Sequence, residues 1–178
     1  IGSLALIEGA DADLWEQRFA ALAANDVITS LDPNARPVVV KDKDPYVARL
    51  LRIMKHARVL KLSDEDLEYL APDQPLMDAF EHICSETQAA IIILTKGADG
   101  AVVRCGSTQF DVAAAQANPL VDTVGAGDTF MGTLLVEISK TGLSASKLGS
   151  IAENELTRIV TRAAKAAALN CQSAGCNP

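Results

Sequence analysis

The sequence "TVGAGDTF", residues 123–130, places a glycine-rich turn directly before an apolar helical pattern. Glycine lets the backbone of such a turn approach a ligand closely, and the first amides of a helix, together with its dipole, attract negative charge. Asp128 follows at once, and the same dipole favours the ionised form of a carboxylate in the first helical turn. The turn therefore combines donors for an anion with a proton acceptor.

Transfer of a phosphoryl group to an alcohol needs both kinds of group. The amides of Gly125, Ala126 and Gly127 would hold the transferred group, while Asp128 would accept the proton of the hydroxyl. The spacing is equally compatible with a structural role, in which Asp128 only begins a helix and the glycines allow close packing. Two other nucleotide motifs are excluded, because the sequence has no G-x-x-x-x-G-K-[ST] and Phe130 stands where the dinucleotide fingerprint has its third glycine.

The elements that must position this turn alternate between strand and helix patterns, which predicts one α/β domain with a mostly parallel sheet between two helical layers. Strands are expected at residues 1–7, 26–31, 57–62 and 89–97, followed by a hairpin of 98–105 and 107–114. Helices are expected at residues 13–25, 44–56, 76–85, 126–140 and 153–171, with a further one after Ser63. Ligands of such sheets bind beyond the carboxyl ends of the strands, which selects the loops "DPNAR", "KLSDED", "TKGADG" and "DTVGAGD".

Two of these loops contribute further polar candidates. Asn34 and Arg36 follow the second strand, where Arg could bind phosphate or a substrate oxygen bidentately, although a solvent-facing Arg would give the same pattern. Lys61 could face phosphate or extend along the surface to solvent. Ser63 and Asp66 resemble a helix capping box, with Asp in place of the usual Glu.

Composition limits the classes of partner. The formal charge of −7 and the lack of a Lys/Arg run argue against nucleic acid, and no apolar stretch approaches the roughly 20 residues of a membrane span. In the last helix, Arg158, Arg162 and Lys165 lie opposite an apolar stripe. We therefore expect small-molecule partners. Four cysteines without a C-x-x-C pair favour reduced thiols, no zinc site and a cytoplasmic location: Cys84, Cys105, Cys171 and Cys176.

The segment "DTVGAGDTF" strongly resembles the second signature of the ribokinase-like, or PfkB, family of carbohydrate kinases. "SLDPNARP" is similar to a segment of the fructokinase and 2-keto-3-deoxygluconate kinase branches, and "VLKLSDEDLEYL" favours fructokinase. "LTKGADGAVV" resembles the ATP-binding strand and hairpin of the family, and "AAALNCQSAG" resembles its last helix. The resemblance covers nearly the whole chain and implies a ribokinase-like fold.

The resemblance implies roles for individual residues. Asp128 would be the catalytic base, and the turn from Gly125 to Gly127 the anion hole. Mg²⁺ would be held through water by Ser63 and Asp66, which replace the N-x-x-E motif of the family and also suffice as a helix cap. Three positions would line the ATP site and a fourth would lie near the adenine: Thr95, Gly97, Gly100 and Asn170. A monovalent cation, for which K⁺ is the candidate, would contact the Asp122 side chain and the carbonyls of Val124 and Gly175.

For several of these positions a simpler explanation stays open. Ordinary turn chemistry accounts for Thr95 and Gly100, and Asp122 could be a turn former. Relatives in this family also carry an N-terminal part with a glycine-rich sugar-binding motif and a β-sheet lid, neither of which is in residues 1–178. We therefore expect the chain to be the C-terminal, ATP-binding part of one kinase domain, with weak nucleotide binding and no turnover on its own.

The expected activity is ATP-dependent phosphorylation of a sugar hydroxyl, with fructose first and 2-keto-3-deoxygluconate as the alternative. The partners would be the sugar and ATP, and the resemblance leaves open a homodimer of the full-length protein. A nucleotide-binding module that transfers nothing is the competing class.

Overall fold

The computed structural model describes residues 1–175 and contains one five-stranded sheet with the order β1-β2-β3-β4-β5. The first three strands are parallel, and β3–β4 and β4–β5 are antiparallel pairs, so four of the five strands run in one direction. The prediction of a mostly parallel sheet is confirmed. The strands are β1 (Ser30–Leu31), β2 (Val59–Ser63), β3 (Ile91–Thr95), β4 (Ala101–Cys105) and β5 (Thr108–Val112).

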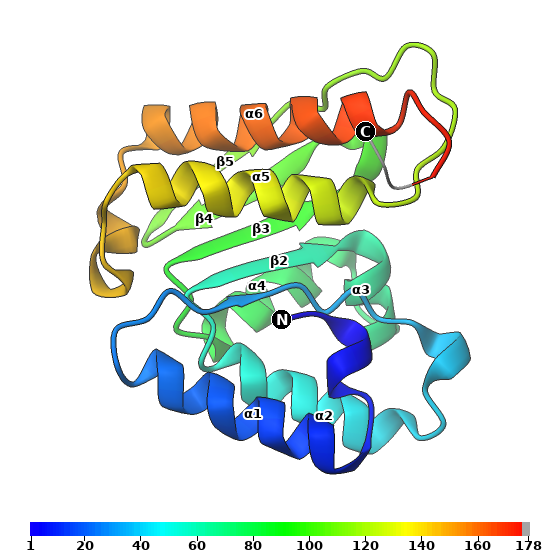
Figure 1. Cartoon of the computed structure of the whole chain (residues 1–178), viewed down its shortest axis with the longest axis vertical. Helices are drawn as coiled ribbons and strands as arrows, with labels where there is room; N and C mark the ends of the chain where they lie inside the picture. The colour runs from blue at the N-terminus through cyan, green and yellow to red at the C-terminus, as the bar shows by residue number, and fades with distance from the viewer. Residues whose placement is uncertain (176–178) are drawn as a thin grey trace.

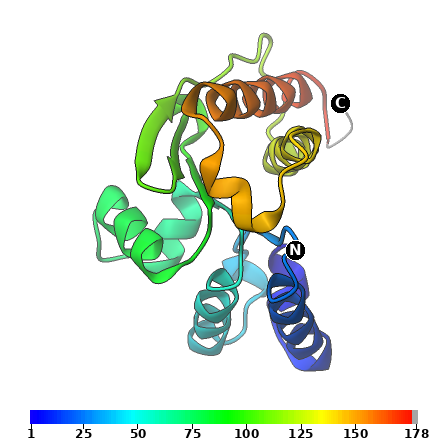
Figure 2. The same ribbon diagram turned by 90° about the vertical axis from the view of Figure 1, so that its left-hand side faces the viewer.

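Helices cover both faces of the sheet, which confirms the three-layer arrangement (Figures 1 and 2). One hydrophobic cluster joins the first face to α1 (Gly9–Ala23), α2 (Lys43–Met54), α3 (Asp64–Leu70) and α4 (Leu76–Glu86). A second cluster joins the other face to α5 (Ala126–Lys140) and α6 (Glu153–Asn170). Four short 3₁₀ helices complete the elements: η1 (Ser3–Leu6), η2 (Pro37–Val39), η3 (Gly97–Asp99) and η4 (Ala145–Ser150).

Strands β2 and β3 are apolar because both of their faces are covered. Along β2, Leu60 and Leu62 belong to the first cluster, while Val59 belongs to the second. Successive side chains of a strand point to opposite faces, so an unbroken apolar run is what two covered faces require. Lys61 breaks this run, and its position in the alternation directs it toward the α5 side.

Of the two strands predicted near the N-terminus, the first is absent from residues 1–7 and the second is shorter than predicted. In place of the first one, Ser3–Leu6 form η1, and Gly2 makes an isolated parallel bridge to Asp32. A strand would place Leu4 and Leu6 on one face, but Leu6 is fully buried and Leu4 is 68% exposed, which a helical turn allows. The second strand shrinks to Ser30–Leu31.

Local conformation explains part of these differences. Asp26 has a left-handed backbone (φ 57°) and Val27 is exposed, so the chain turns where a strand was expected. Helix α1 begins four residues earlier than predicted, and no side-chain cap marks its start. Helix α5 has the predicted bounds. The sequence analysis did not predict η4.

The carboxyl ends of β2 and β3, the start of α5 and the end of α6 lie at the same end of the molecule (Figure 1). This is the edge at which parallel α/β sheets bind ligands. None of the helices in the described part of the chain is both long and apolar enough to cross a membrane.

Candidate active site

The glycine turn begins α5 with unpaired donors. Gly125 is the N-cap and has a left-handed backbone (φ 79°), a conformation that glycine adopts without steric cost. The Ala126 amide donates to Thr123 O at 3.2 Å, whereas the amides of Gly125, Gly127 and Asp128 donate no hydrogen bond within residues 1–175. Asp128 is exposed in the first turn. These amides and the dipole of a 15-residue helix meet at one place.

A buried cation lies beside this turn. Lys61 is 4% exposed, and its Nζ lies 3.0 Å and 2.9 Å from the two carboxylate oxygens of Asp32. A Cβ placed on Gly127 would lie 3.5 Å from the same Nζ. Burial raises the pKa of Asp32, the Lys61 charge opposes this rise, and the charges of Asp66 and Asp128 add to it. The alternative of a surface lysine is therefore wrong.

Asp66 joins the cap of α3 to the loop after β1. Its Oδ2 accepts hydrogen bonds from Ser63 N at 2.9 Å and Ser63 Oγ at 2.8 Å, and its own amide donates to Ser63 Oγ. Its Oδ1 accepts the Ala35 amide at 2.7 Å. The capping box is thus confirmed. The Asp66 carboxylate is 1% exposed and both of its oxygens accept hydrogen bonds from the protein. A magnesium-bound water held by Ser63 and Asp66 stays a prediction.

The loop after β1 has a fixed backbone and an exposed cation. Asn34 has a left-handed conformation (φ 42°), which this residue type tolerates better than most. Arg36 lies in solvent, where its Nη1 donates only to Ala35 O at 3.3 Å. Behind the loop, burial raises the pKa of Tyr46 to about 12, and its buried hydroxyl has no hydrogen-bond partner among the described residues.

The residues predicted to hold a monovalent cation lie together. Asp122 Oδ1 accepts the Val124 amide at 3.1 Å, and its Oδ2 accepts the Gly175 amide at 2.9 Å. These hydrogen bonds, the one from Gly175 first, lower the pKa of Asp122. Asn170 is fully buried, and its Nδ2 donates to Val124 O at 2.8 Å. Its Oδ1 is buried without a partner in residues 1–175, so the group has an unsatisfied oxygen that a cation could contact.

The residues predicted to line the ATP site have structural contacts of their own. Thr95 ends β3 beside Ser63, and its Oγ1 donates to Leu62 O at 3.2 Å. A Cβ on Gly100 would lie 2.3 Å from Val112 O, so the hairpin alone requires glycine there. Gly97 also has a positive φ, at the start of η3. Contacts of these residues and of Asn170 with a nucleotide stay predictions.

Sequence reasoning missed Asp32. A signal was available, since Lys61 interrupts a buried apolar strand and a buried ammonium requires an anionic partner. Asp32, at the end of the neighbouring strand, is this partner. Strand pairing places Ser30 beside Val59 and Leu31 beside Leu60. The next residues on the two strands, Asp32 and Lys61, therefore lie side by side.

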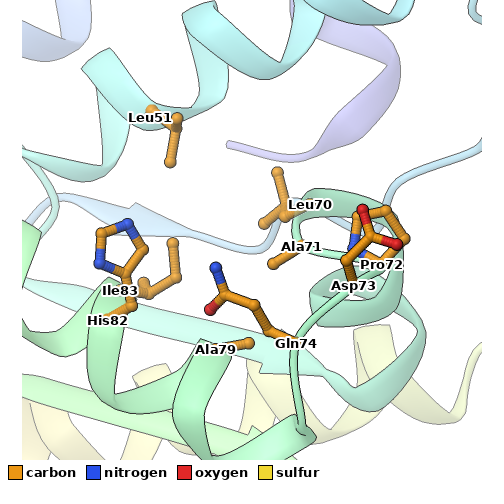
Figure 3. A pocket seen from close by; sticks show the side chains of 9 residues that line it. All are labelled: Leu51, Leu70, Ala71, Pro72, Asp73, Gln74, Ala79, His82 and Ile83. Carbon is orange, nitrogen blue, oxygen red and sulfur yellow. The ribbon is translucent and has the colours of Figure 1, made fainter.

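Two other features lie outside the predicted site. A depression of about 290 Å³ between α2, the α3–α4 loop and α4 is lined by none of the predicted site residues (Figure 3). Cys84, Cys105 and Cys171 are free thiols, while Cys176 lies outside the described residues. Within residues 1–175, the structure has no group of three or more His, Cys, Asp or Glu side chains that could hold a metal ion.

Comparisons with known proteins show the family to which this chain belongs. The family described as "pfkB family carbohydrate kinase" matches residues 1–178 of the sequence. The chain therefore belongs to the pfkB family of carbohydrate kinases. It is 35% identical over 142 residues to a fructokinase of Rhizobium leguminosarum bv. trifolii, and 32% identical over 146 residues to one of Escherichia coli. These matches cover 80% and 82% of this chain but only 43% and 45% of the relatives, so the chain spans less than half of their length.

Solved structures extend the likeness to the fold. A double mutant of fructokinase from Vibrio cholerae O395, with fructose, ADP and potassium ion bound, has a TM-score of 0.83 and 26% identity; the match covers 98% of this chain and 54% of that one. An aminoimidazole riboside kinase from Salmonella enterica, complexed with aminoimidazole riboside and an ATP analogue, has a TM-score of 0.84 and 22% identity; the match covers 99% and 56%. The second likeness shows the fold alone.

Proposed function

We propose that the protein, at its full length, phosphorylates a sugar hydroxyl with ATP, and that fructose is the first substrate to test. The observation that carries this proposal is the glycine turn. Unpaired amides, a buried ammonium and an exposed carboxylate meet at the first turn of α5. The curated relatives named fructokinase favour fructose.

In this proposal each group has one task. The amides of Gly125 and Gly127, together with that of Ala126, would orient the transferred phosphoryl group, and the Lys61 ammonium would stabilise the charge that develops on it. Asp128 would accept the proton of the attacking hydroxyl. Because Asp128 is exposed while Lys61 is buried, the carboxylate is on the open side, from which a sugar could enter. Magnesium bound to the nucleotide would neutralise phosphate charge.

A monovalent cation fits the group formed by Asp122, Val124 and Asn170. We infer that K⁺ would contact the Val124 carbonyl and hold the backbone that leads into Gly125. The buried Asn170 Oδ1, which lacks a partner in the described residues, supports this inference. The related Vibrio cholerae structure contains potassium ion.

One observation favours a second substrate. The Arg36 guanidinium is exposed and contacts only the neighbouring carbonyl, so it could bind the carboxylate of an acid sugar. This feature would suit 2-keto-3-deoxygluconate. The two substrates differ in charge at neutral pH, and the Arg36→Gln variant should therefore weaken use of the acid while leaving use of fructose nearly unchanged.

The test is an ADP-release assay of the full-length protein with fructose, 2-keto-3-deoxygluconate, ribose and adenosine, each with and without KCl. We expect ADP release above the sugar-free rate with fructose. ATP binding without ADP release on any of the four would instead favour a non-catalytic nucleotide-binding module. The 178-residue chain, assayed in parallel, should bind ATP weakly and release no ADP, because it lacks the sugar-binding motif expected of the family.

A further inference from the structure

A group of cations lies where α5 and α6 pack together. Glu137 of α5 is 5% exposed, and its carboxylate lies 2.6 Å from Lys140 Nζ, 3.1 Å from Arg162 Nη1 and 3.7 Å from Arg158 Nη1. Hydrogen bonds from Lys140 and Arg162 lower the pKa of Glu137. The buried carboxylate therefore stays charged near neutral pH and fixes the cations around it. We name Lys140, Arg158, Arg162 and Lys165 the α5–α6 cation cluster.

The carboxylates of this region do not neutralise the cluster. Besides Glu137, only Glu155 lies within ion-pair distance of a member, 3.9 Å from Arg158, among the residues that the structure describes. Lys165 has no ion pair in residues 1–175. The two Arg side chains are 58% and 60% exposed, so they keep donors for a ligand. The region is positive on a protein whose formal charge is −7.

The shape of the cluster limits the kind of anion. Arg158, Thr161, Arg162 and Lys165 line a depression of about 410 Å³ on the surface of α6. Arg158 and Lys165 are seven residues apart, which corresponds to about 10 Å along a helix. A long anion with several charges can therefore contact both side chains at once. One guanidinium group can bind two phosphate oxygens at once. A chain of phosphates has both the length to reach along α6 and the negative charge to pair with several cations.

The cluster is distinct from the glycine turn. Glu137 lies eleven residues after Ala126, which corresponds to about 16 Å along α5. The triphosphate of a nucleotide bound at the turn would not reach the Arg side chains around Glu137. We propose that the α5–α6 cation cluster is a second anion site, which binds a polyphosphate chain. This proposal does not depend on the proposed kinase activity.

The experiment titrates the full-length protein with inorganic triphosphate in a calorimeter. The test variant is Arg158→Gln/Lys165→Gln, because Lys140 and Arg162 remain to pair with the buried Glu137. The control is Arg18→Gln/Lys55→Gln, which removes the same charge from two exposed residues that form no ion pair within residues 1–175. We expect the test variant to lose one binding step, with affinity reduced at least about tenfold, and the control to keep it.

The binding stoichiometry separates this site from the glycine turn. The test variant should bind one triphosphate fewer than the wild type, whether or not the turn itself binds phosphate. Equal titrations of wild type and test variant, or an equal loss in the control, would overturn the proposal. If circular dichroism shows that the test variant is unfolded, the single variant Lys165→Glu takes its place in the titration. This substitution breaks no ion pair of the described residues and should weaken the same binding step. A second titration with ATP identifies the source through the one binding step that the test variant loses: competition by ATP for that step indicates a nucleotide, and no competition for it indicates free polyphosphate.

Discussion

The candidate site has two sides that differ in how their polar groups are satisfied. On the side of β1 and β2, Asp32, Lys61 and Asp66 are buried, and the charged atoms of all three have hydrogen-bond partners. On the side of α5, Asp128 is exposed and three amides lack partners within residues 1–175. The first side is complete without a ligand, whereas the second has donors that an anion would satisfy.

This difference separates residues that hold the site from residues that act in it. A buried ion pair costs much when one partner is removed, because the other charge stays in a low-dielectric environment. An exposed carboxylate keeps its water and contributes little to stability. We therefore expect substitutions of Asp32 and Asp66 on the β1–β2 side to reduce mainly stability, and substitutions on the α5 side to reduce turnover. Lys61 belongs to both groups, because it pairs with Asp32 and also lies beside Gly127.

The largest effect is expected for Asp128→Asn in the full-length protein. Loss of the proton acceptor should reduce turnover on the order of 10²- to 10⁴-fold, with little change in the thermal midpoint. The control is Asp78→Asn, since Asp78 is also an exposed acid in the first turn of a helix, α4. It removes the same favourable interaction with a helix dipole. Turnover by Asp128→Asn close to the wild-type rate would remove this residue from the mechanism.

Lys61→Met should have the largest effect on stability. It leaves the Asp32 carboxylate buried without its partner, so the free energy of unfolding should fall by about 3–5 kcal/mol. Urea unfolding followed by circular dichroism measures the change. Lys41→Met is the control, because Lys41 pairs with Glu8 at 2.7 Å but is 79% exposed, and we expect no resolvable change there.

A second variant examines the cause of that loss. In Lys61→Met/Asp32→Asn the uncompensated charge is gone, so part of the lost stability should return. If the double variant is no more stable than Lys61→Met alone, the cost comes from packing around Lys61 and not from the buried charge. In either variant, a weaker affinity for nucleotide phosphate would support the role of Lys61 beside Gly127.

Local patterns were the part of this molecule that could be predicted. Helix α5, the capping box of Ser63 and Asp66, and the buried strands β2 and β3 each depend on residues close in sequence. The Asp32–Lys61 pair was not predicted, since its members are 29 residues apart and meet only through strand pairing. The cap formed by Asp66 was predicted because it is local in sequence. Its contact with the Ala35 amide was not, because the two residues are also far apart in sequence.

Asp66→Asn should have a smaller effect than Lys61→Met. An amide in place of the carboxylate cannot accept all of the bonds from Ser63 and Ala35, so we expect a loss of about 1–3 kcal/mol in the free energy of unfolding. Asp64→Asn is the matched control two positions away, since Asp64 is exposed and accepts only from the neighbouring Glu65 amide. An equal loss in both variants would mean that charge near the start of α3 matters more than the contact with the loop.

The smallest effect concerns pH and Asp122. Hydrogen bonds from the amides of Gly175 and Val124 lower the pKa of this carboxyl in the folded protein, below the unfolded value of about 3.9. The stabilisation is therefore present above that pH and is lost as the pH falls through the lower, folded value. Thermal midpoints of the wild type should fall between pH 6 and pH 3, and part of this fall should be absent in Asp122→Asn.

The comparison between variants matters here because Glu16 and Glu137 also have lowered pKa values and contribute to the same fall. Only the difference between wild type and Asp122→Asn belongs to the turn that leads into α5. If K⁺ binds beside Val124, added KCl should raise the midpoint of the wild type at pH 6 more than NaCl does. Identical pH curves for the two proteins would show that the amides of Gly175 and Val124 contribute nothing measurable to the stability of this turn.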